Sequence, residues 1–199
     1  RSGVGGLENS QLLMLPGPTN VPSRVMRAMA KPVINHRGPE FRELYKRILE
    51  NLKFVFETKG DVLVFTSSGT GGIECAIRNI LSNGDRVAVP VNGVFSERLR
   101  KAVTAFGGKG IEIPIEWGKA ITASQVEDLF TREKDIKAFA VVYNETSTGA
   151  TTRDLKEIGR ICHDHGALFV VDAISILGGD MLPVDEWDVD ICVAGSQKC

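Results

Sequence analysis

Apolar residues recur along the chain in two arrangements, as short continuous runs and at steps of three or four residues. From Pro39 to about Thr58 the apolar positions follow the spacing of one face of an amphipathic helix. Apolar runs typical of buried strands cover residues 62–65, 86–91, 138–143, 168–171 and 189–194, and residues 111–115 alternate as a strand does. Helical stretches are predicted between them over residues 71–81, 94–106, 122–130 and 152–165.

This alternation of apolar runs and helical stretches predicts the fold class. Strands that alternate with helices are joined by right-handed crossovers and form a mainly parallel sheet covered on both faces. Thr122 and Gln125 have the spacing of a capping box, which supports one of these helix starts. The sequence therefore predicts an α/β three-layer sandwich over residues 21–199, the large domain of the chain.

The first twenty residues follow a different pattern. Residues 1–6 are treated as a leader outside the fold, and residues 1–20 as an extended segment. Pro16-Gly17-Pro18 excludes a helix there because each proline restrains its neighbour. A short helix is expected to begin near Pro22, with Asn20 or Thr19 as its cap.

Composition narrows the class of protein. The net charge of -1 comes from interspersed acids and bases, so the sequence offers no basic stripe for nucleic acid. No apolar run is long enough for a membrane span, and a cytoplasmic location is expected by default. The four cysteines are widely spaced, which suits reduced thiols better than a disulfide framework or a zinc site. His163 and His165 face different sides of a helix, so no metal site is expected there either.

Candidate chemistry gathers where the predicted strands end. Lys198 follows the run 189–194, and an amine at a strand end can form a Schiff base with an aldehyde cofactor. Asp172 ends the preceding strand and can pair with a protonated pyridine nitrogen. Ser68, Gly69 and Thr70 stand between a strand and a helix start, where backbone N–H groups can bind phosphate.

Two further candidates complete the set. Phe95 begins a helix and can stack on a flat ring, whereas Thr146 can hydrogen-bond a phenolic oxygen. Each feature alone also fits a structural role: a tight turn, a capping aspartate, a core phenylalanine or a polar loop. Together they offer partners for a phosphate, a ring face, a ring nitrogen and an aldehyde, which favours a pyridoxal 5′-phosphate site.

With these residues in view, the chain resembles the class V (fold-type I) aminotransferases, in particular the alanine–glyoxylate and serine–pyruvate group. The resemblance rests on Pro16 to Asn20, Ser68-Gly69, Asn92 to Phe95, Glu145 to Gly149, Val171-Asp172, Leu177 to Gly179 and Gly195 to Lys198. It assigns Lys198 the Schiff base and Asp172 the ring nitrogen. It places the remaining roles on Phe95 for stacking, Ser68, Gly69, Thr70 and Gln197 for phosphate, Ile174 for the cofactor, Thr146 for cofactor and substrate, and Gly17 for substrate.

The resemblance also implies what lies outside this sequence. Thr70 stands where some relatives have histidine. Family members continue for a comparable further length, with a small C-terminal domain that supplies the arginine for the substrate carboxylate. They are homodimers whose partner subunit reaches the phosphate site. The chain is accordingly expected to be either an N-terminal fragment of such an enzyme or one piece of a cleaved or split enzyme that a C-terminal chain completes.

The implied activity is transfer of an amino group from alanine or serine to glyoxylate or pyruvate. Another enzyme of the same superfamily, a cysteine desulfurase or a lyase, would use a similar site. The desulfurase is disfavoured because Phe95 and Gln197 stand where that branch tends to place histidines. An inert cofactor-binding or dimerisation module is the alternative from another class.

Overall fold

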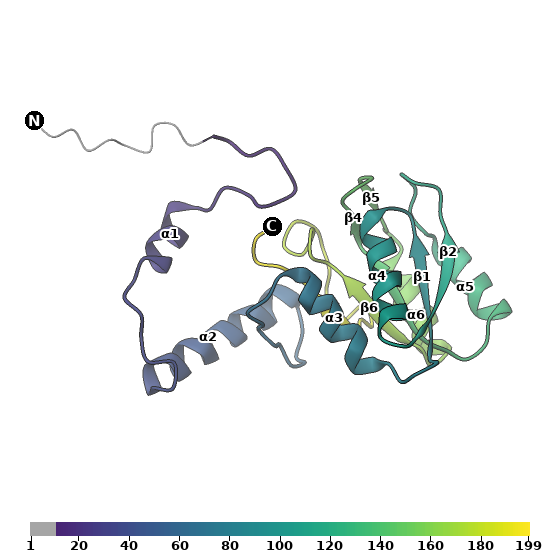
Figure 1. Cartoon of the computed structure of the whole chain (residues 1–199), viewed down its shortest axis with the longest axis horizontal. Coiled ribbons are helices and arrows are strands. Elements are labelled where there is room, and N and C mark those ends of the chain that lie inside the picture. The colour runs from purple at the N-terminus through teal and green to yellow at the C-terminus, as the bar shows by residue number, and fades with distance from the viewer. Residues whose placement is uncertain (1–10) are drawn as a thin grey trace, which may run out of the picture.

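The computed structural model describes residues 11–199, so the leader expected over residues 1–6 lies outside the described residues. Figure 1 shows a twisted sheet with helices packed on it and an N-terminal region that extends to one side. The helices are α1 (Ser23–Met29), α2 (Pro39–Phe56), α3 (Gly69–Ile80), α4 (Val94–Ala105), α5 (Ala123–Arg132) and α6 (Leu155–Asp164). The strands are β1 (Arg86–Val91), β2 (Lys109–Pro114), β3 (Ile136–Val142), β4 (Asn144–Glu145), β5 (Ala150–Thr151), β6 (Leu168–Asp172) and β7 (Ile191–Val193).

The main sheet confirms the predicted fold class. Its strand order is β2-β1-β3-β6-β7, and every neighbouring pair runs parallel. Helices α3 and α4 cover one face, and α5 and α6 cover the other, which gives three layers. Successive residues of a strand point to opposite faces of the sheet. Val87 and Val89 therefore pack against α3 and α4, whereas Ala88 packs on the face covered by α5 and α6.

The segment Val62–Phe65 is the clearest departure from the prediction. It is extended chain outside the sheet, and the side chains of Leu63, Val64 and Phe65 are 72%, 47% and 51% exposed. An apolar run makes a strand only when a neighbouring strand satisfies its backbone groups. Within residues 11–199 no strand lies beside it, because the sheet ends at β7.

The start of α1 also differs from the expectation. Its N-cap is Pro22, and no side chain caps it. The Asn20 side chain instead accepts a hydrogen bond from the backbone N–H of Leu13 and donates one to the carbonyl of Gln11. The amide is thus used within the extended segment, and the first N–H groups of α1 lack a side-chain acceptor from Asn20 or Thr19.

Gly159 on α6 makes a close backbone contact that yields a stability prediction. A Cβ at this position would overlap the carbonyl oxygen of Trp187. Gly159→Ala should therefore lower the free energy of unfolding by about 2 kcal/mol, although alanine has the better helix propensity. Chemical denaturation measures the loss, and Glu157→Ala on the exposed side of α6 is the control. A variant as stable as the parent would show that Trp187 moves away freely.

Within residues 11–199, no helix combines the length and the apolar character that crossing a membrane requires. Cys75, Cys162, Cys192 and Cys199 are free thiols in the structure. His163 and His165 are both exposed; His163 lies beside Asp188 and Asp190, whereas the His165 ring stacks on Phe130.

Candidate functional site

A cavity of about 420 Å³ lies at the carboxyl ends of β3, β6 and β7, between these strand ends and helices α3 and α4. This is the edge at which parallel α/β sheets bind ligands. The nine residues that the sequence assigned to the cofactor all line it: Ser68, Gly69, Thr70, Phe95, Thr146, Asp172, Ile174, Gln197 and Lys198. They come from segments far apart in the sequence, and the parallel topology brings them to one place.

The wall made by α3 has the form of an anion site. Ser68 is the N-cap of the helix, and its side chain makes no capping hydrogen bond. The N–H groups of the first turn, beginning at Gly69, therefore lack a side-chain acceptor from the cap. Gly69 also permits a close approach, since a Cβ there would lie 2.5 Å from Cδ1 of Ile174. Backbone donors and the positive helix end together suit a phosphate.

Asp172 ends β6 as a buried acid, with 8% of its surface exposed. Its carboxylate accepts a hydrogen bond of 3.0 Å from the backbone N–H of Ile174, and no cation of the described residues is paired with it. Burial raises the pKa of Asp172 to about 6; the Ile174 N–H lowers it, and the negative charge of Glu145 raises it further. A buried acid without a positive partner suits a cationic ring nitrogen.

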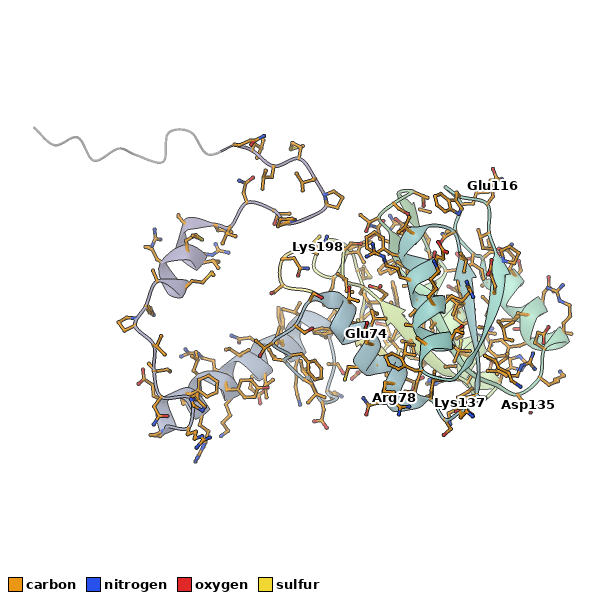
Figure 2. All side chains as sticks on the ribbon, in the orientation of Figure 1. Glu74, Arg78, Glu116, Asp135, Lys137 and Lys198 are labelled. Atoms are coloured by element: carbon orange, nitrogen blue, oxygen red, sulfur yellow. The ribbon has the colours of Figure 1, made fainter. Side chains whose placement is uncertain are left out.

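Lys198 extends from the loop after β7 into the cavity, beside the segment that carries Gly17 (Figure 2). A Cβ at Gly17 would approach the lysine Nζ to 2.8 Å and overlap its side-chain carbons. The hydroxyl of Thr19 donates a 3.4 Å hydrogen bond to the carbonyl of Lys198. Gly17 thus lies against the lysine side chain itself, and the absence of a Cβ leaves room for the lysine.

Glu145 stands between the lining residues Asn144 and Thr146 and is fully buried in the short hairpin of β4 and β5. This carboxylate accepts hydrogen bonds from the backbone of Phe95 and Ser96 at the start of α4, and from Ser147 in the hairpin loop. Burial would raise its pKa, but the bonds from Ser147 and Ser96 leave the pKa of Glu145 below its ordinary value. The group is therefore an ionised carboxylate at neutral pH.

Asn144, Ser175 and Arg98 also line the cavity, and no motif in the sequence predicts them as site residues. The Asn144 amide donates to the Ser175 hydroxyl at 3.1 Å, and this hydroxyl donates back to the Asn144 carbonyl at 3.0 Å. Arg98 lies over the ring of Phe95, 5.2 Å from its centroid. Only their positions in the sequence could have indicated that they line the site. Asn144 follows β3, Ser175 follows Asp172, and Arg98 is one helical turn after Phe95.

The fold and the cavity together define an α/β protein with a candidate ligand site at the carboxyl edge of its parallel sheet. The unpaired buried acid, the amine and the uncapped helix start fit a phosphorylated pyridine aldehyde as cofactor. The family model for class-V aminotransferases matches residues 12–199. The chain belongs to the class-V aminotransferase family.

Individual relatives agree with this assignment. The chain is 47% identical to an uncharacterized aminotransferase of Methanocaldococcus jannaschii over 95% of the chain and 49% of the relative. It is 39% identical to the serine–glyoxylate aminotransferase of Methylorubrum extorquens, with 94% and 47% covered. The crystal structure of Bacillus subtilis ureidoglycine–glyoxylate aminotransferase matches with a TM-score of 0.91 at 32% identity, with 96% and 49% covered. The chain spans about half the length of the curated relatives it matches.

Proposed function

We propose that residues 21–199 form a pyridoxal 5′-phosphate-binding domain and that Lys198 holds the cofactor through a Schiff base. The observation that carries the proposal is the convergence of Lys198 and the unpaired acid Asp172 in one cavity. The first turn of α3 would bind the phosphate, with Gln197 beside it, and Phe95 would stack on the ring. Thr146 would hydrogen-bond the phenolic oxygen.

The proposed reaction is transfer of an amino group from alanine or serine to glyoxylate or pyruvate. When bound, the cofactor supplies an electron sink for the carbanion that forms at the substrate α-carbon. Lys198 then acts as the base and acid that moves the proton, and Asp172 keeps the ring nitrogen protonated. Two relatives with different named donors share glyoxylate as the named acceptor, so glyoxylate is the better supported acceptor.

The proposal also concerns the oligomeric state and the partners of the protein. We expect a homodimer, because the described N-terminal region carries large exposed apolar side chains, among them Met14, Met29 and Phe54 at 85%, 72% and 85% exposure. A cytoplasmic location and the absence of a nucleic-acid partner stay predictions of the sequence. Gly17, beside the Lys198 side chain, remains the proposed substrate contact from this segment.

A cysteine desulfurase or a lyase is the alternative within the superfamily, and an inert cofactor-binding or dimerisation module is the alternative outside it. Phe95 and Gln197 stand in the cavity at the positions where histidines would favour the desulfurase. Amino transfer and the two other reactions leave different products from the same amino acid, so the products can distinguish them.

The test is an assay of the protein that contains this chain, loaded with pyridoxal phosphate. Alanine and serine are supplied as donors, and glyoxylate and pyruvate as acceptors. Formation of glycine from glyoxylate, with ping-pong kinetics, is the expected result. Binding of the cofactor without any amino transfer would reject the transferase, and release of sulfide from cysteine would favour the desulfurase.

A further inference from the structure

The carboxylate of Glu145 accepts hydrogen bonds both from the hairpin loop and from the start of α4. Oε1 accepts from the Phe95 N–H at 3.3 Å, the Ser147 N–H at 3.2 Å and the Ser147 hydroxyl at 2.6 Å. Oε2 accepts from the Ser96 N–H at 2.8 Å and the Ser96 hydroxyl at 2.9 Å. Five donors from two separate segments thus converge on one side chain with no exposed surface.

The two segments that meet at Glu145 carry cavity residues. The donors at Phe95 and Ser96 belong to the first turn of α4, and the Phe95 ring lines the cavity. The donor at Ser147 follows Thr146, which lines the cavity from the hairpin loop. The Ser147 hydroxyl also accepts a 2.9 Å hydrogen bond from the N–H of Val94. The Glu145 carboxylate and the Ser147 hydroxyl therefore each connect the start of α4, which carries Phe95, to the hairpin, which carries Thr146.

The backbone around Glu145 is arranged to admit its carboxylate. A Cβ at Gly93, the N-cap of α4, would lie 2.5 Å from Cγ and Cδ of Glu145 and from the Ser147 hydroxyl. Only glycine leaves that space. The charge also suits its place, because the positive end of α4 stabilises a carboxylate at the first turn. Charge-assisted hydrogen bonds of this kind are about twice as strong as neutral ones.

We propose that Glu145 is a positioning residue: its carboxylate fastens the start of α4 to the β4–β5 hairpin and so holds Phe95 and Thr146 at a fixed separation across the cavity. It does not reach the reacting atoms and acts through these two side chains. The effect on cofactor binding rests on the proposed function. The hydrogen bonds that join α4 to the hairpin through Glu145 are present in the cofactor-free protein.

Glu145→Gln is the first test. The amide keeps the size of the side chain but presents an NH₂ group to donors that need an acceptor, so at least one buried N–H loses its partner. In the cofactor-free protein, amide hydrogen exchange should accelerate together at Phe95, Ser96 and Ser147. Pyridoxal phosphate should bind roughly tenfold more weakly, with a smaller visible circular dichroism signal from the bound ring.

Glu97→Gln is the matched control. It lies in the same first turn of α4, but its carboxylate is partly exposed and pairs with Lys101 at 2.6 Å. It should leave exchange, cofactor affinity and circular dichroism as in the parent. Ser147→Ala provides a second variant, because this exposed residue loses its hydroxyl bonds to Glu145 and Val94 without emptying a buried site and keeps its N–H bond to Glu145. It should shift the same signals in the same direction.

Two results would overturn the positioning role. One is unchanged exchange at Phe95, Ser96 and Ser147 in both Glu145→Gln and Ser147→Ala. The other is accelerated exchange with cofactor affinity and circular dichroism unchanged, which would make the network purely structural. If the parent protein binds no pyridoxal phosphate, the proposed function fails, and the exchange rates alone then decide whether Glu145 fastens the two segments.

Discussion

Replacing Lys198 with alanine is expected to abolish covalent attachment of pyridoxal phosphate and to lower kcat by about 10²- to 10⁴-fold. The fall follows because the variant lacks the amine that links the cofactor and moves the substrate proton. Borohydride reduction followed by peptide mass mapping should find the cofactor on the peptide that contains Lys198 in the parent, and on no peptide in the variant. The phosphate site remains, so noncovalent binding should persist.

Lys101→Ala is the control for this experiment, since Lys101 also lines the cavity but pairs with Glu97 on the exposed surface of α4. It should retain the covalent cofactor and most of the activity. If the reduced cofactor were found on Lys101 or on another lysine, the assignment of Lys198 would be wrong even with the cofactor claim intact.

Asp172→Asn is expected to lower kcat by about 10²-fold or more while the covalent link at Lys198 survives. An uncharged amide cannot hold a proton on the ring nitrogen, so the electron-withdrawing form of the cofactor is lost from the site. Steady-state kinetics measure the fall, and borohydride trapping checks that the cofactor is still attached. Unchanged kcat would remove Asp172 from the mechanism.

The same substitution should stabilise the cofactor-free protein at neutral pH. Burial raises the pKa of Asp172 from 3.8 to about 6, so the folded protein binds this proton more tightly than the unfolded chain does. The parent protein therefore has its full free energy of unfolding below about pH 4. This free energy falls by about 3 kcal/mol as the pH rises through 6. The variant should therefore match the parent near pH 4 and exceed it by about that amount at pH 7.

Urea unfolding of both proteins from pH 4 to pH 8 tests this difference. Asp185→Asn is the opposite control, because hydrogen bonds from Thr58 and the Lys59 N–H hold the pKa of Asp185 below its ordinary value. That variant should be less stable than its parent at pH 7. A stability difference for Asp172→Asn that does not vary with pH would mean that the acid is not desolvated.

The sequence predicted most of the fold because periodicity and strand ends are local signals. Ten helices and main-sheet strands, α2 to α6 with β1, β2, β3, β6 and β7, begin and end within a few residues of the predicted bounds. The Thr122 capping box that opens α5 is confirmed. Asp172 and Lys198 were predicted to lie close together because parallel strands place their carboxyl ends at one edge, and both line the same cavity. Their chemical roles stay predictions.

The parts that were missed depend on contacts distant in the sequence. The sequence did not predict the hydrogen bonds of Glu145, because its donors at Phe95 and Ser96 lie some fifty residues away and no spacing rule connects them to it. Val62–Phe65 was predicted as a strand because its composition is that of one, but strand formation needs a neighbour that residues 11–199 do not provide. The roles of Asn144 and Ser175 likewise arise only when β3 and β6 lie side by side.

The strand order has a consequence for biosynthesis. As the nascent chain leaves the ribosome, β1, β2 and β3 can pair before β6 has been made, and the Glu145 carboxylate can join α4 to the hairpin once Thr151, the end of β5, has emerged. Lys198, behind the outermost strand, comes later than every other group in the cavity. The cavity walls formed by α3, α4 and the hairpin are thus synthesised before the Lys198 amine.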